Sequence, residues 1–163
     1  MTIPSPCLRG SLSPGLFLAL GAAVAIALGW VGAAFSLAGK APVGVVSLGI
    51  GVALGLLLVG LAQILRISRQ RVLIFGAVAL AIVTTLAQHG WLYRAYCVKW
   101  RQDRIDQPGV ALFRPETEPL STVAYFQREL KYSSGQAALW AADGALIVAA
   151  AVGVIVVSQR REK

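Results

Sequence analysis

The chain of 163 residues is 57% hydrophobic and only 13% charged, with a mean hydropathy of +0.72. Because soluble globular domains carry about 25% charged residues, this composition excludes an ordinary soluble domain. The formal net charge of +8 does not point to a nucleic acid as partner, since the cations separate long apolar runs instead of covering one face of a soluble fold.

Four apolar runs are each long enough to cross a membrane as a helix. A bilayer core about 30 Å thick needs about 20 helical residues, and the runs lack the alternation typical of strands. The sequence therefore predicts an all-α, single-domain integral membrane four-helix bundle over residues 1–163, with the lipid bilayer as its surroundings. Its expected spans are 16–38, 43–65, 72–93 and 136–158, and a sizeable extramembrane loop covers 94–135.

The first run, 16–38, has a second interpretation as a signal peptide cleaved after Ala38. It is about twice the usual 7–15 residues of such a segment, and the stretch before it carries only one cation, Arg9. We therefore expect an uncleaved first helix.

Basic segments predict the orientation in the membrane. The joint at 66–71 holds three arginines, and the tail at 159–163 holds three more cations. With four spans these segments and Arg9 lie on one side, and Lys and Arg are enriched in cytoplasmic loops. We expect both termini in the cytoplasm, in a bacterial inner membrane, although seven cations in the 94–135 loop oppose this bias.

Small residues at helical spacing mark expected helix contacts. Gly51 and Gly55 form a GxxxG motif in the second run, and Gly29 belongs to a similar series in the first. Such residues let membrane helices approach closely. The motif is compatible with homodimerisation, but it favours packing of the second run on the first, since only a few residues connect them.

Two ionisable side chains, His89 and Asp143, lie at membrane depth. If the third and fourth runs are antiparallel neighbours, they meet each other, with Gln88 close by. We favour a structural polar clamp between two helices. A proton- or ion-handling site and solvation at the interface by snorkelling are the alternatives.

The 94–135 loop is where recognition is expected. The third helix is predicted to continue to about Asp106, because no helix breaker precedes Pro108. A short helix capped by Ser121 or Thr122 should follow, with Val123, Phe126 and Leu130 on its apolar side. Candidate contacts to a partner or to lipid headgroups are Arg94, Trp100, Arg101, Arg104 and Phe126, although an interfacial aromatic belt also explains the composition.

The sequence contains no HExxH or GxSxG motif, and its cysteines, Cys7 and Cys97, are isolated. We therefore expect no cofactor, no metal and no enzymatic activity. The predicted function is an accessory, scaffold or assembly subunit that contacts a protein partner through 94–135. The alternative is a small homo-oligomeric transporter or channel with a polar site at His89 and Asp143. The layout is similar to that of tetraspanins, but the loop lacks their Cys-Cys-Gly motif, so no family is assigned.

Overall fold

The structure is a computed structural model that describes residues 12–39, 44–65, 67, 70–106, 119–132 and 134–161. Over these residues the chain forms helices and no strand, and four of the helices are long and apolar enough to cross a membrane. The predicted all-α membrane bundle is thereby confirmed. Cys7, Arg9, Arg66 and Arg69, on which sequence predictions rest, lie outside the described residues. The helices are α1 (Leu12–Ala38), α2 (Val45–Ile64), α3 (Gln70–Asp106), α5 (Thr122–Tyr132) and α6 (Ser134–Arg161).

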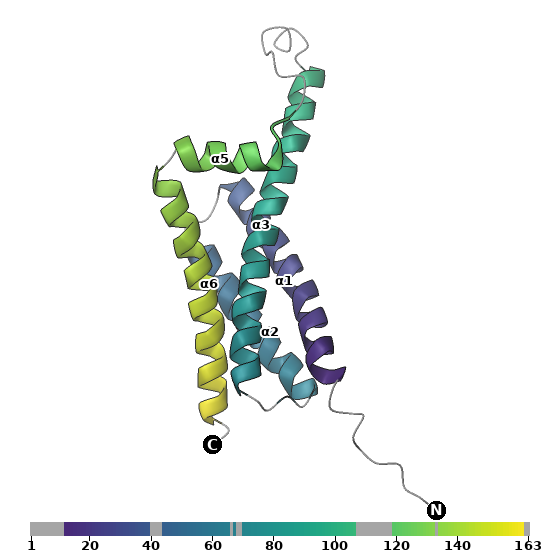
Figure 1. Cartoon of the computed structure of the whole chain (residues 1–163), viewed down its shortest axis with the longest axis vertical. Coiled ribbons are helices and arrows are strands. Elements are labelled where there is room, and N and C mark those ends of the chain that lie inside the picture. The colour runs from purple at the N-terminus through teal and green to yellow at the C-terminus, as the bar shows by residue number, and fades with distance from the viewer. Residues whose placement is uncertain are drawn as a thin grey trace, which may run out of the picture.

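The four long helices stand side by side, and α5 lies across one end of them (Figure 1). The most extensive contacts join α1 to α3 and α2 to α6, while the contact between α1 and α2 is smaller. Within each large contact the two helices run parallel: Gly44 of α2 approaches Leu146 of α6, and Gly55 approaches Val154. Helices consecutive in the chain are therefore not the main partners.

The Gly51–Gly55 motif packs against α6. A Cβ atom at Gly51 would lie 2.7 Å from the Ile147 carbonyl oxygen, and one at Gly55 would lie 2.9 Å from the Ala151 carbonyl oxygen. Only glycine allows the two backbones to come this close. The sequence favoured the first helix as the partner of this motif. The structure instead places α6 of the same chain against both glycines.

Gly29 plays the corresponding part between α1 and α3. A Cβ atom at Gly29 would lie 2.7 Å from the Thr84 carbonyl oxygen and 2.7 Å from the Ala87 Cβ atom. The buried Thr84 hydroxyl donates a 2.9 Å hydrogen bond to the Leu80 carbonyl oxygen, so its polar group is satisfied within α3. Gly29 therefore lies in the contact between α1 and α3.

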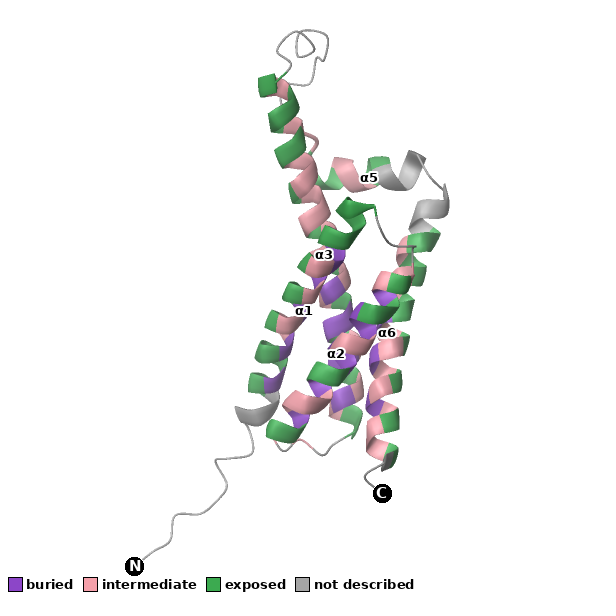
Figure 2. Cartoon of the chain, turned by 180° about the vertical axis from the view of Figure 1, so that it is seen from behind, coloured by how far each residue is buried: buried purple, intermediate pink, exposed green. Residues whose placement is uncertain are grey.

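The buried residues lie on the parts of the long helices that face one another (Figure 2), and large apolar residues are also exposed on the outside of the bundle. Phe17, Leu54 and Ile147 are fully buried, whereas Phe75, in the second turn of α3, is 74% exposed. A soluble protein rarely exposes so much contiguous apolar surface. Lipid tails are the surroundings that suit it.

The third helix is much longer than a span requires. Its 37 residues correspond to about 55 Å at 1.5 Å per residue, against a hydrocarbon core of about 30 Å. Its end at Asp106 confirms the predicted boundary. After it, the Ala124 N–H donates a 3.3 Å hydrogen bond to the Ser121 hydroxyl oxygen, which confirms Ser121 as the cap of the short helix.

Candidate functional site at the α3–α5 end

An aromatic cluster joins α3, α5 and α6 where α5 crosses the bundle. Its rings form a continuous chain of contacts: the centroids of Tyr96 and Tyr125 are 4.9 Å apart, and those of Phe126 and Trp140 are 5.9 Å apart in an edge-to-face arrangement. Aromatic pairs in such geometries stabilise beyond their buried area. The cluster consists of His89, Tyr93, Tyr96, Tyr125, Phe126 and Trp140.

A hydrogen bond ties the start of α5 to the same cluster. The Tyr93 hydroxyl donates it to the Leu120 carbonyl oxygen over 2.9 Å. The inner face of α5 is therefore made by Tyr125 and Phe126, which are half-buried, while Val123 is exposed. Of the predicted apolar stripe, Phe126 packs in the aromatic cluster and Val123 is exposed. The side chain of Leu130 lies outside the described residues.

His89 packs among rings instead of pairing with a carboxylate. Its ring centroid is 4.4 Å from that of Trp140 and 6.3 Å from that of Phe126. Asp143 follows Trp140 by one turn of α6 and is close enough to act electrostatically on His89. Within the described part of the chain, however, no hydrogen bond or ion pair joins His89 to Asp143.

Gln88 is directed away from that pair. Its side-chain amide donates a 3.5 Å hydrogen bond to the Ser36 hydroxyl oxygen of α1. Successive residues of a helix point about 100° apart, so Gln88 faces α1 while its neighbour His89 faces α5 and α6. The structure therefore does not bring Gln88, His89 and Asp143 together as one site.

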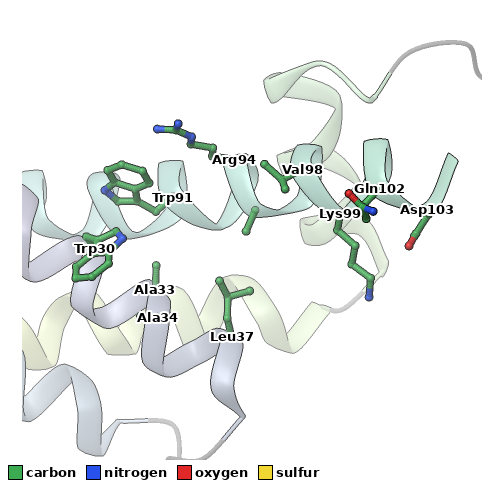
Figure 3. A pocket seen from close by; sticks show the side chains of 11 residues that line it. Trp30, Ala33, Ala34, Leu37, Trp91, Arg94, Val98, Lys99, Gln102 and Asp103 are labelled. Atoms are coloured by element: carbon green, nitrogen blue, oxygen red, sulfur yellow. The ribbon is translucent and has the colours of Figure 1, made fainter. Parts of the chain in front are cut away.

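A groove of about 510 Å³ runs between the end of α1 and the upper part of α3 (Figure 3). We name it the α1–α3 groove. Trp30 of α1 and Trp91 of α3 lie at one end of it (Figure 3), and the Arg94 guanidinium lies 5.2 Å from the Trp91 ring centroid. Its lining residues are Trp30, Ala33, Ala34, Leu37, Trp91, Arg94, Ala95, Val98, Lys99, Gln102 and Asp103.

Past the end of α1, α3 continues as a helical extension (Figure 1), one side of which, with Lys99, Gln102 and Asp103, still lines the groove. Arg101 and Ile105 are exposed on one side of it. On another side, the Arg104 guanidinium lies 4.4 Å from the Trp100 ring centroid. We call residues 99–106 the α3 extension.

The structure thus divides the five predicted contact residues among three places. Arg94 lines the groove, and Phe126 belongs to the aromatic cluster. Trp100, Arg101 and Arg104 lie on the extension.

Sequence reasoning missed Trp30 and Tyr125 as parts of these features. Trp30 lies some 60 residues before Trp91 in the chain, and only the parallel pairing of α1 with α3 brings the two together. Tyr125 is adjacent to Phe126, and the expected apolar side of α5, with Val123, Phe126 and Leu130, did not include it. In the described residues no group of three His, Cys, Asp or Glu side chains is arranged to hold a metal ion.

No protein family, curated protein or solved structure matches this chain.

Proposed function

We propose that this multi-pass membrane protein is a non-enzymatic accessory or assembly subunit, and that the α3 extension is the surface that contacts its protein partner. The observation that carries the proposal is the position of Ile105, which is 73% exposed. It lies about 18 Å beyond residue 93, where the predicted third span ends, at 1.5 Å per residue. Each headgroup layer is only about 5–8 Å thick, so Ile105 projects past the lipid.

The extension has the mixed character of a partner surface. Arginine is enriched at protein interfaces, and Arg101 lies one helical turn before Ile105. The aromatic cluster and the Tyr93 hydrogen bond tie α5 to the base of the extension. A partner would thus meet a helix held in place in advance, which lowers the entropy cost of binding. The chemistry favours a partner with acidic residues around an apolar pocket.

The test is native electrophoresis of the full chain extracted from its own membrane, with mass spectrometry of its companions. We expect a stoichiometric foreign partner that is lost in the double variant Arg101→Glu/Ile105→Ser and retained in Arg71→Gln, which changes an exposed arginine at the other end of α3. A lone monomer, or a partner retained by the double variant, would overturn the proposal.

The transporter or channel alternative predicts a symmetric homo-oligomer in the same experiment. Its polar site finds less support, because the His89 ring packs against the Trp140 ring at a tilt of 43° and neither His89 nor Asp143 lines the α1–α3 groove.

We also propose a bacterial inner-membrane orientation with both termini in the cytoplasm, which puts α5 and the α3 extension outside. In a chain carrying Cys7→Ser and Cys97→Ser, a cysteine in place of Arg71 should resist a membrane-impermeant thiol reagent applied to intact cells. A cysteine in place of Arg101 should react with it. The opposite pattern would reverse the orientation without affecting the helix arrangement.

A further inference from the structure

Helix α6 stands at one edge of the bundle (Figures 1 and 2) and is the least buried of the four membrane spans. On one side of it, Ile147, Ala151 and Ile155 are fully buried. The opposite side is exposed over residues 139–157, which is about five helical turns. This span therefore offers a long surface that the described helices leave uncovered.

The exposed side of α6 has the residue pattern of a helix contact. Two leucines alternate with alanine and glycine at spacings of three and four residues, and a Cβ atom at Gly153 would meet no described atom within 4 Å. Such spacing provides the knobs and holes through which helices pack in a membrane. The outside of α3 instead carries bulky side chains such as Phe75 and Ile82, which suit lipid tails. We name five exposed residues the α6 seam: Leu139, Ala142, Leu146, Ala149 and Gly153.

One carboxylate flanks the α6 seam. Asp143 directly follows Ala142 and lies about 7–8 Å along α6 from Ala138, where the apolar span begins. It is half-buried, and within the described part of the chain it makes no hydrogen bond or ion pair. A carboxylate at this depth is costly without a partner. With Leu139 at position a of a heptad, Asp143 is at position e, where charge selects the partner of a packed helix.

From these observations we propose that the α6 seam binds a transmembrane helix of a partner protein, and that a Lys or Arg of that helix pairs with Asp143. Charge complementarity specifies the cation, and a second copy of this chain does not supply one at this depth. Lys and Arg are absent from residues 16–38, 45–64, 72–93 and 138–159. The seam shares no residue with the α3 extension, so the inference does not rest on that surface.

The test is photocrosslinking of the full chain in its own membrane, with p-benzoylphenylalanine in place of Leu139. This position lies one helical turn from Asp143 and already holds a large side chain. We expect an adduct whose cross-linked peptide, identified by mass spectrometry, is a membrane-spanning segment of another protein and contains a Lys or Arg. The same photoreactive residue in place of Phe75, which is 74% exposed on α3, should give no protein adduct.

Variants of Asp143 test the charge pair. Asp143→Asn should lower the adduct yield about five-fold, the ratio expected for one polar contact between membrane helices. Asp143→Glu keeps the charge and should retain the adduct. Asp143→Lys should abolish it, and an aspartate in place of the cation in the identified segment should then restore it.

A bulky residue in the α6 seam tests the packing independently of charge. Ala149→Trp fills a small position and should abolish the adduct. Ala141→Trp is the matched control, because Ala141 is exposed on the same helix but lies outside the seam. Arg101→Glu/Ile105→Ser should leave the yield unchanged, which distinguishes failure of this contact from failure of the α3 extension. Unchanged helicity by circular dichroism identifies folded variants.

Several results would overturn the proposal. They are an adduct with a second copy of this chain, the absence of any protein adduct, a cross-linked segment without Lys or Arg, and full yield in Asp143→Asn. Equal yields in Ala149→Trp and Ala141→Trp would do the same. Should Ala149→Trp misfold, Asp143→Asn alone decides, because it changes one carboxylate to an amide of the same shape.

Discussion

Helix α6 makes two very different contacts along its length. Towards its C-terminus, Ile147 and Ala151 lie against the glycines of α2, with backbone atoms close enough to exclude a single extra methyl group. Near its N-terminus, Trp140 meets His89 and Phe126 through rings whose centroids are 4.4–5.9 Å apart. The C-terminal half of α6 packs where glycines of α2 let the two backbones approach closely. The N-terminal half packs through large aromatic rings.

The difference follows from the surroundings of each half. Inside the bilayer, lipid is as apolar as the helix, so association depends on van der Waals contact at small residues. At the end of the bundle, aromatic rings can lose contact with water as they pack, which adds a hydrophobic contribution. Glycine contacts therefore set the distance between spans, while the aromatic cluster positions α5. Variants on the two sides of this comparison should fail in different ways.

The largest effect is expected at the glycine contact. Gly51→Ala puts a Cβ atom 2.7 Å from the Ile147 carbonyl oxygen, so α2 and α6 must separate. We expect the free energy of unfolding to fall by about 2–3 kcal/mol, the usual cost of overpacking, as measured by circular dichroism during denaturation in mixed SDS micelles. The control is Gly49→Ala in the same helix, where nothing lies within 4 Å. Equal losses in the two variants would show that α2 and α6 do not pack here.

A loss of about 2 kcal/mol is expected for Trp140→Ala, roughly half the usual cost of truncating a fully buried tryptophan, because Trp140 is only half-buried. The helices should remain paired, and the loss should appear as faster amide hydrogen exchange in α5. Trp100→Ala is the control, since Trp100 contacts Arg104 outside the cluster. If α5 exchanges equally fast in both variants, the cluster does not hold it.

The sequence predicts the helices themselves better than the contacts between them. The lengths of the apolar runs and the charges between them predicted the helices, and the absence of a helix breaker before Pro108 predicted the end of α3 at about Asp106, where the structure has it. The helix that packs on Gly51 could not be predicted, because any two membrane helices with small residues on one face can pack closely. The short connection between α1 and α2 favoured α1, whereas the structure places α6 there. The predicted grouping of Gln88 with His89 was also not found, because the two residues are adjacent in sequence but point about 100° apart on α3, so that Gln88 contacts α1 and His89 contacts α6.

A smaller effect is expected from Tyr93→Phe, which keeps the ring in the cluster and removes the hydrogen bond to the Leu120 carbonyl oxygen. A net loss of about 1 kcal/mol is typical of one such bond. Hydrogen exchange at the start of α5 measures it directly, around Thr122. Tyr96→Phe is matched in chemistry and should change little, because the described contacts of Tyr96 are made by its ring. The reverse order of the two effects would contradict the assignment.

The smallest effect concerns the energetic coupling of His89 to Asp143. The imidazole packs against the Trp140 ring in a tilted arrangement and makes no hydrogen bond or ion pair with the Asp143 carboxylate within the described residues. A double-mutant cycle with His89→Ala and Asp143→Asn should therefore give a coupling free energy below about 0.5 kcal/mol, the range of pairs without direct contact.

The parallel cycle with His89→Ala and Trp140→Ala provides the comparison. Stacked aromatic pairs contribute about 0.5–1.5 kcal/mol, so this coupling should exceed the first when unfolding is followed in the same micelles. A larger coupling to Asp143 than to Trp140 would restore the polar clamp expected from sequence. The predicted order instead makes His89 a member of the aromatic cluster, in which its ring contributes to holding α5 over the end of α3 and α6.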